Sequence, residues 1–74
     1  MRAAALTAAE ILRWPPTVDV PTAGSAWGIG RGLSYELARR GEFPVPVRRI
    51  GSRLRVVTAD ILGDLGIGAA GNAP

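Results

Sequence analysis

The sequence predicts a small, mainly α-helical domain that carries one β-hairpin. Helix signals occur in four short stretches, Gly and Pro residues separate these stretches, and two β-rich runs flank a Gly51-Ser52 pair. The chain has 74 residues. A chain of this length buries only about 60% of its unfolded surface, so we expect a single domain with a thin core.

Composition argues against most enzyme chemistry. The chain has neither Cys nor His, which removes disulfides, cysteine-based metal sites and the commonest general base. We therefore expect a protein that is not an enzyme and that uses no cofactor and no metal. No uncharged run is long enough for a membrane-spanning helix, and the N-terminal apolar run is too short for a signal peptide. The expected location is cytoplasmic, with no membrane partner.

Positive charge is concentrated in one part of the chain. The net charge is +3, and all nine cations are arginines. Residues 31–55 hold seven arginines and two acids, so this segment carries +5 and the flanks together carry −2. A concentrated basic block is typical of proteins that bind a polyanion. The sequence therefore predicts an anion-binding module.

The N-terminal segment, residues 1–16, is predicted to hold a short amphipathic helix and a Pro-Pro linker. Thr7 and Glu10 have the spacing of a capping box, in which each side chain binds the backbone N–H of the other residue. We expect the helix to run from about Ala8 to Trp14. Pro15-Pro16 then ends it, because proline cannot continue a helix.

Two further helices are expected on either side of a glycine-containing turn. The first runs from Pro21, which suits an opening turn, to about Trp27, although Gly24 weakens it. Gly28-Ile29-Gly30 breaks the pattern and forms a tight turn. The second helix runs from Arg31 to Arg40, and Gly41 closes it as a left-handed cap.

The helix from Arg31 to Arg40 has two different faces. One arc is small and apolar and should pack on the preceding helix; it holds Leu33, Ser34, Leu37 and Ala38. The other arc is rich in arginine and holds Arg31, Gly32, Tyr35, Glu36, Arg39 and Arg40. Two helices joined by a short turn, with such a face on the second, form a helix-turn-helix arrangement that can read guanines or bind phosphates. On these residues alone, a solvated face remains the alternative.

Val45 to Ile50 and Arg53 to Val57 are predicted to form a hairpin with a type II′ turn at Gly51-Ser52. The expected pairs are Ile50 with Arg53, Arg49 with Leu54, Arg48 with Arg55 and Val47 with Val56. Val47, Leu54 and Val56 then pack on the domain, while the opposite face holds Arg48, Arg53 and Arg55. Two arginines directly opposite each other repel, and a neighbouring phosphate backbone would relieve this. Screening by water and salt is the alternative.

The last element is predicted to be a helix from Thr58 to Leu65. Thr58 is its expected cap, Asp60 suits the positive N-terminus, and the apolar face holds Ile61, Leu62 and Leu65. From Gly66 onwards the sequence looks like a frayed tail. We therefore place the functional domain at residues 17–67 and a flexible tail at residues 68–74.

The central segment resembles a known family. Gly28-Ile29-Gly30-Arg31, followed by the Tyr35–Pro44 run YELARRGEFP, resembles the MerR-like winged-helix proteins of the excisionase class, short proteins of actinobacteria and their mobile elements. Residues 47–57 (VRRIGSRLRVV) are similar to their wing, and Thr58 to Leu65 to their closing helix. The resemblance implies a winged helix-turn-helix fold and sequence-specific binding of double-stranded DNA. The helix from Arg31 would enter the major groove, and the wing would lie on the adjacent backbone or minor groove.

The resemblance also implies a set of DNA-binding residues. Groove-facing positions correspond to Arg31, Gly32, Tyr35, Glu36 and Arg39, and wing positions to Arg49, Ser52, Arg53 and Arg55. Arg40 and Arg48 complete the predicted site. Position 36 is often basic in relatives, so Glu36 suggests either a contact with a cytosine amino group or no contact. Leu33 stands where a small polar residue is common, which weakens the case for a phosphate contact there.

Two roles remain open for such a DNA-binding protein. One is an excisionase-type recombination directionality factor that works with an integrase or recombinase, and the other is a small transcription regulator. Both imply association with the nucleoid and self-association into dimers or head-to-tail arrays on DNA, because one chain presents only one helix to the groove. The alternative is a protein-interaction adaptor, whose N-terminal helix docks a partner while the arginines bind an acidic surface.

Overall fold

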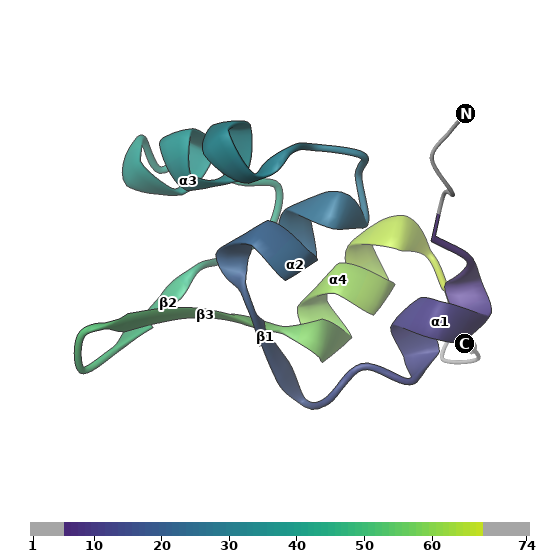
Figure 1. The fold of residues 1–74 in the computed structure, drawn as a ribbon. Coiled ribbons are helices and arrows are strands. Elements are labelled where there is room, and N and C mark those ends of the chain that lie inside the picture. The colour runs from purple at the N-terminus through teal and green to yellow at the C-terminus, as the bar shows by residue number, and fades with distance from the viewer. Residues whose placement is uncertain (1–5, 68–74) are drawn as a thin grey trace.

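The computed structural model describes residues 6–67, and within that range it is a mixed α/β fold of four helices and one three-stranded antiparallel sheet (Figure 1). The elements follow in the order α1 (Ala8–Leu12), β1 (Thr17–Asp19), α2 (Val20–Ser25), α3 (Arg31–Arg39), β2 (Arg48–Ile50), β3 (Arg53–Val57) and α4 (Thr58–Leu65). The strand order is β1-β3-β2. The four predicted helices and the hairpin are present, but strand β1 was not predicted, so the fold is mixed rather than mainly α-helical.

The start of α1 is confirmed as predicted, and its end comes earlier. The Thr7 N–H donates to Glu10 Oε1 over 2.9 Å, and the Glu10 N–H donates to Thr7 Oγ1 over 3.1 Å. These two bonds form the capping box. The helix ends at Leu12 rather than Trp14. Trp14 precedes Pro15, and the residue before a proline disfavours the helical region.

Strand β1 leads directly into α2. Its three residues pair with β3, so that Val18 lies opposite Val56 and Asp19 opposite Arg55. Asp19 then caps α2, because its Oδ1 accepts a hydrogen bond of 2.9 Å from the Thr22 N–H. Proline stands in the first turn of α2, as predicted. The helix ends at Ser25, two residues before the expected Trp27.

Helices α2 and α3 approach each other closely at one glycine. Gly24 and Ser34 are both buried, and a Cβ on Gly24 would lie 1.9 Å from Ser34 Oγ and 2.9 Å from Ser34 Cβ. The Ser34 hydroxyl instead donates to the Gly30 carbonyl oxygen over 2.8 Å. From the sequence, Gly24 was expected to weaken its helix. In the structure, the missing side chain of Gly24 lets α3 pack closely against α2.

The buried side of α3 is narrower than the predicted apolar arc. Ser34 is fully buried, but Leu33 is 52% exposed, so the prediction that Leu33 packs on α2 was wrong. Ser34 marks the point of closest approach to α2, and Leu33 lies about 100° around the helix from it. Tyr35, which was assigned to the outer arc, is half-buried and packs against the core. Gly41 has a φ of 71°, which confirms the predicted left-handed turn after α3.

The hairpin has the predicted register. Arg48 pairs with Arg55, Arg49 with Leu54 and Ile50 with Arg53. The fourth expected pair lies outside the ladder, because β2 begins only at Arg48. Gly51 has a φ of 64° whereas Ser52 has no positive φ, which is the combination that a type II′ turn requires.

The start of α4 differs from the prediction. Val57 is the residue that caps this helix, without a side-chain hydrogen bond, and Thr58 is already inside it. The buried Thr58 hydroxyl donates instead to the Pro15 carbonyl oxygen, and the Thr58 N–H donates to the Pro16 carbonyl oxygen over 2.8 Å. Thr58 therefore ties α4 to the segment that follows α1.

The end of α4 also differs. Gly66, with a φ of 69°, is its left-handed cap, and the Ile67 N–H donates to the Leu62 carbonyl oxygen over 2.9 Å. Residues 66 and 67 thus belong to the fold rather than to a frayed tail. The flexible tail expected at residues 68–74 lies outside the described residues.

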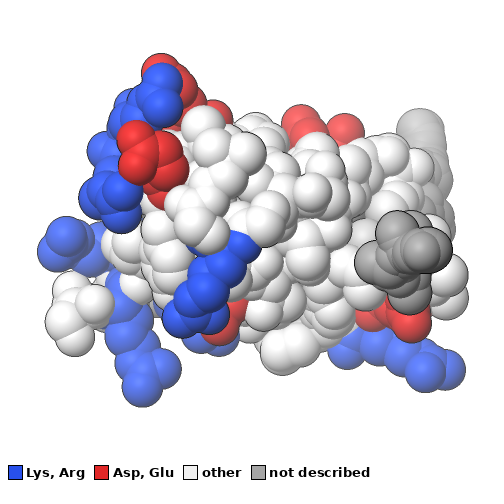
Figure 2. All heavy atoms as spheres, turned by 45° about the horizontal axis from the view of Figure 1, so that its top comes forward, with Lys and Arg blue, Asp and Glu red and all other residues white. Residues whose placement is uncertain are grey.

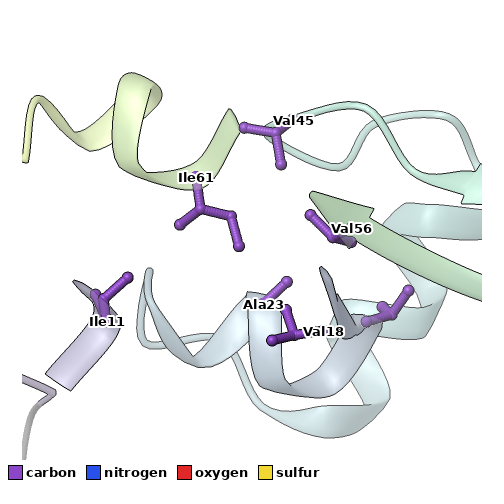
Figure 3. Close-up of a cluster of buried hydrophobic side chains, with 7 residues drawn as sticks. Ile11, Val18, Ala23, Val45, Val56 and Ile61 are labelled. Carbon is purple, nitrogen blue, oxygen red and sulfur yellow. The ribbon is translucent and has the colours of Figure 1, made fainter. Parts of the chain in front are cut away.

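One apolar core joins the helices to the sheet. Its buried members are Ile11, Val18, Val20, Ala23, Val45, Val56 and Ile61 (Figure 3). Ile11 comes from α1, which packs on α4, and it is only 3% exposed. Both tryptophans pack around this core. Trp27 also meets the ring of Phe43 edge to face, with centroids 5.9 Å apart.

Candidate nucleic-acid interface

The hairpin and α3 lie towards the same end of the molecule, while α1 lies at the opposite end (Figure 1). In Figure 2, arginine side chains gather at the hairpin end, and most of the middle of that view is uncharged. The basic segment that the sequence identified therefore becomes a localised surface. Two different elements, one helix and one hairpin, contribute to it.

Eight of the eleven predicted site residues are exposed: Arg31, Gly32, Arg39, Arg40, Arg48, Arg49, Ser52 and Arg53. The other three, Tyr35, Glu36 and Arg55, are partly buried. Exposure makes the first group available to a large ligand. The second group makes contacts within the protein, and these contacts shape the surface.

A shallow hollow connects α3 with the hairpin. Its volume is ≈ 360 Å³, and it is lined by Asp19, Tyr35, Ser52, Arg53, Leu54 and Arg55. Three parts of the fold meet here: the junction of β1 and α2, the middle of α3, and the hairpin turn with strand β3. Sequence reasoning placed Tyr35 on a helix and Ser52 on a wing, and the structure brings the two to one depression.

Tyr35 also orders the first turn of α3. The guanidinium carbon of Arg31 lies 5.5 Å from the centre of the Tyr35 ring, within the range of a cation–π contact. Because Tyr35 is itself packed against the core, the ring is a fixed platform. Arg31 thereby lies beside Tyr35, one of the residues that line the hollow.

Glu36 is engaged by the arginines that follow it. Its Oε1 lies 2.6 Å from Arg39 Nη2, and its Oε2 lies 3.6 Å from Arg40 Nη1. Glu42 approaches Arg40 from the other side, with 3.2 Å between Oε1 and Nη2. The positive charge at the end of α3 is therefore partly compensated by carboxylates of the same chain.

The hairpin arginines are in a different situation. Among residues 6–67, no carboxylate lies within ion-pair distance of Arg48, Arg49 or Arg53, and all three are exposed. Arg55 instead turns towards β1, where its Nη2 donates to the Thr17 carbonyl oxygen over 3.0 Å and its Nε to Thr17 Oγ1 over 3.2 Å. Thr17 lies in β1, on the opposite side of β3 from β2, so these hydrogen bonds direct the Arg55 guanidinium away from the strand that holds Arg48. Thr17 was missed because a three-residue strand leaves little trace in a sequence.

Asp19 provides a pH-sensitive contact at the edge of the hollow. Hydrogen bonds from Thr22 hold the pKa of Asp19 below its ordinary value of 3.8, and the charges of Arg55 and Arg31 lower it further. The folded-state pKa is thus lower than the unfolded one. The carboxylate consequently stabilises the fold above about pH 4, and this contribution is lost as the pH falls through the lowered pKa.

We expect Asp19→Asn to flatten the acid side of the stability curve. Asn can still cap α2, but it carries no charge that protonation could remove. Urea unfolding between about pH 6 and pH 2 measures the free energy of unfolding for both proteins. The difference between them should shrink as the pH falls. A constant difference over the whole range would contradict this role of Asp19.

The described part of the chain has neither a metal-binding cluster nor a membrane-spanning helix. Residues 6–67 contain no cluster of three or more acidic side chains that could hold a metal ion. No helix in this range has the length and apolar character needed to cross a bilayer. Comparison with protein families, curated proteins and solved structures gives no match.

Proposed function

We propose that this protein binds double-stranded DNA as a small winged helix-turn-helix protein, with α3 as the reading helix and the β2–β3 hairpin as the wing. The observation that carries the proposal is the set of exposed hairpin arginines, Arg48, Arg49 and Arg53, which have no carboxylate partner among the described residues. Such unpaired charges on a protruding hairpin suit a phosphate backbone, whose neutralisation releases counterions.

The arrangement of α2 and α3 supports the same proposal. The glycine at position 24 lets α3 sit close on α2, which fixes the orientation of α3 through its buried side. Arg31 and Arg39 are both exposed on α3, and their forked donors match guanine edges as well as phosphates. A hairpin next to the exposed side of α3 would reach the backbone or the minor groove beside the groove that α3 enters.

Two biological roles use this same DNA contact: recombination directionality in the manner of excisionases, together with an integrase or recombinase, and regulation of transcription. Because one chain presents one reading helix, tight sites call for dimers or head-to-tail arrays. The alternative role as an adaptor needs an apolar docking face on α1. In the structure Ile11 of that helix is buried in the core, whereas Leu12 is 51% exposed.

Binding to duplex DNA should weaken steeply as salt rises. Each phosphate contact contributes about 0.9 to the slope of log Kd against log salt, so three or four arginine contacts give a slope of about 3. Fluorescence anisotropy of a labelled duplex with mixed sequence, titrated from about 30 mM to 300 mM NaCl, measures this slope.

Arg13→Ala is the matched control for this titration. Arg13 is exposed and follows α1, at the opposite end of the molecule from the hairpin, so its loss should leave the slope unchanged (Figure 1). The proposal fails if the wild-type protein binds no duplex even at the lowest salt. It also fails if Arg13→Ala lowers the slope as much as loss of a hairpin arginine does.

A further inference from the structure

Glu36 occupies the middle of the outward side of α3. It lies about 200° around the helix from Ser34, the residue that faces α2, so it points away from the domain. Its side chain is 44% exposed. Each of its carboxylate oxygens meets a different arginine, Arg39 or Arg40. A negative charge therefore stands where a DNA-binding helix would come closest to its ligand.

The ion pair with Glu36 favours one orientation of the exposed Arg39 side chain. Helical side chains lean towards the N-terminus, over the preceding turn, and Glu36 is three residues before Arg39. The contact of 2.6 Å keeps the guanidinium above the middle of α3 instead of extending it past the end of the helix. Gly32, one further turn back, has no side chain that would compete for this space. Arg39 is thus aimed at the region where base edges would lie.

The same carboxylate opposes unspecific binding. Phosphates surround any duplex regardless of sequence, and a carboxylate near them is repelled. Three hairpin arginines, Arg48, Arg49 and Arg53, have no carboxylate within ion-pair distance among the described residues. The hairpin can therefore attract the phosphates of any duplex. Helix α3 adds affinity only where a base edge can accept hydrogen bonds from Arg39 in its observed orientation. Selectivity between ligands commonly needs such a repulsive element beside an attractive one.

We infer that Glu36 is a specificity-determining residue of the proposed DNA site: it positions Arg39 towards base edges and makes sequence-independent contact with phosphates less favourable. The inference rests on the proposed DNA binding. It replaces both sequence-based alternatives for Glu36, a cytosine contact or no contact, with a role exerted through a neighbouring side chain. Glu36 acts as a positioning residue, because Arg39 makes the contact with DNA.

The test compares Glu36→Gln with Glu42→Gln on two duplexes. One duplex is selected from a random pool by the wild-type protein, and the other has the same composition in scrambled order. Glu42→Gln is the matched control, because it removes the same charge from a residue that contacts Arg40 but not Arg39. Thermal unfolding of both variants checks that each remains folded.

Glu36→Gln should bind the scrambled duplex about three- to tenfold more tightly, because a repelling charge is lost. It should gain little on the selected duplex, so that the ratio of the two dissociation constants falls about three- to tenfold. Glu42→Gln should tighten both duplexes equally and leave the ratio unchanged. Equal changes of the ratio in both variants, or no change in either, would overturn the inference while leaving DNA binding intact. If the wild type binds neither duplex, the proposed function fails and this inference fails with it.

Discussion

Gly24→Ala should destabilise the protein by about 3 kcal/mol, at the upper end of the usual cost of overpacking a core. The added Cβ would lie 1.9 Å from Ser34 Oγ and 2.9 Å from Ser34 Cβ. Rotation of the hydroxyl can relieve only the first of these clashes, because Ser34 Cβ is fixed to the backbone of α3. The two helices would therefore have to separate. A domain of this size has a total stability of only about 4–11 kcal/mol, so the loss is a large fraction of it.

Urea unfolding of Gly24→Ala and Gly63→Ala tests this explanation with one chemical change at two sites. Gly63 lies inside α4, and a Cβ there would have no heavy atom within 4 Å. Alanine at this position should raise the free energy of unfolding by about 0.5–1 kcal/mol, because it favours the helix. If the two substitutions have effects of the same sign, the close contact of α2 with α3 is not what makes Gly24 necessary.

A second substitution should rescue the first. Ser34→Gly removes both atoms that the new Cβ would meet, at a cost of about 1 kcal/mol for glycine inside α3. The double variant should therefore be more stable than Gly24→Ala alone, and the two effects should not add. Additive losses would mean that the residues do not interact. Far-ultraviolet circular dichroism confirms whether each variant keeps its helices at the start of the titration.

Elements whose signals are local could be predicted from the sequence. A two-residue type II′ turn requires a positive φ at its first residue, which Gly51 supplies. Because the turn at Gly51-Ser52 has two residues, its position fixes the register of the whole hairpin. The capping box at Thr7 and Glu10 likewise needs only residues three positions apart. In both cases a few neighbouring residues carry all the information, so distant parts of the chain do not have to be known.

Features that depend on distant partners could not be predicted. Strand β1 has three residues, and it exists because Val18 can pair with Val56, far along the chain. The hydroxyl of Thr58 suggests a helix cap, but the carbonyl of Pro15 becomes available to it only once the chain has folded. Gly24 appears as a helix breaker until α3 lies against it. Helix and strand propensities describe each residue in isolation, and tertiary contacts can make an unfavourable residue necessary for the fold.

In the candidate site, too, local features could be predicted from the sequence and specific contacts between side chains could not. Counting charges located the basic segment 31–55, and helix and turn signals predicted the helix and the hairpin that the structure shows in it. Counting could not tell that Arg55 would bind Thr17 of β1, or that Glu36 would bind Arg39 and Arg40. Once these contacts are known, the arginines no longer form one uniform group. Arg48, Arg49 and Arg53 have no carboxylate within ion-pair distance among the described residues, whereas Arg39 forms an ion pair with Glu36.

This division predicts different effects for two single substitutions. Arg39→Ala should weaken binding to a selected duplex by about 1–3 kcal/mol and change binding to a scrambled duplex much less, because a positioned guanidinium contributes through a base edge. Arg53→Ala should weaken binding to both duplexes alike and lower the salt slope by about 1, because an exposed hairpin arginine contributes through a phosphate. Anisotropy titrations with both duplexes at several salt concentrations measure each quantity.

Arg13→Ala serves as the charge-matched control, since it removes one exposed arginine at the far end of the molecule. If Arg39→Ala and Arg53→Ala have the same effect on both duplexes, positive charge alone accounts for binding, and α3 does not read sequence. If neither differs from Arg13→Ala, the surface formed by α3 and the hairpin is not the DNA site. A loss of discrimination in Arg39→Ala with a normal salt slope, beside the opposite pattern in Arg53→Ala, would assign reading to the helix and attraction to the hairpin. Net charge cannot produce that separation, because all three variants differ from the wild type by the same single charge.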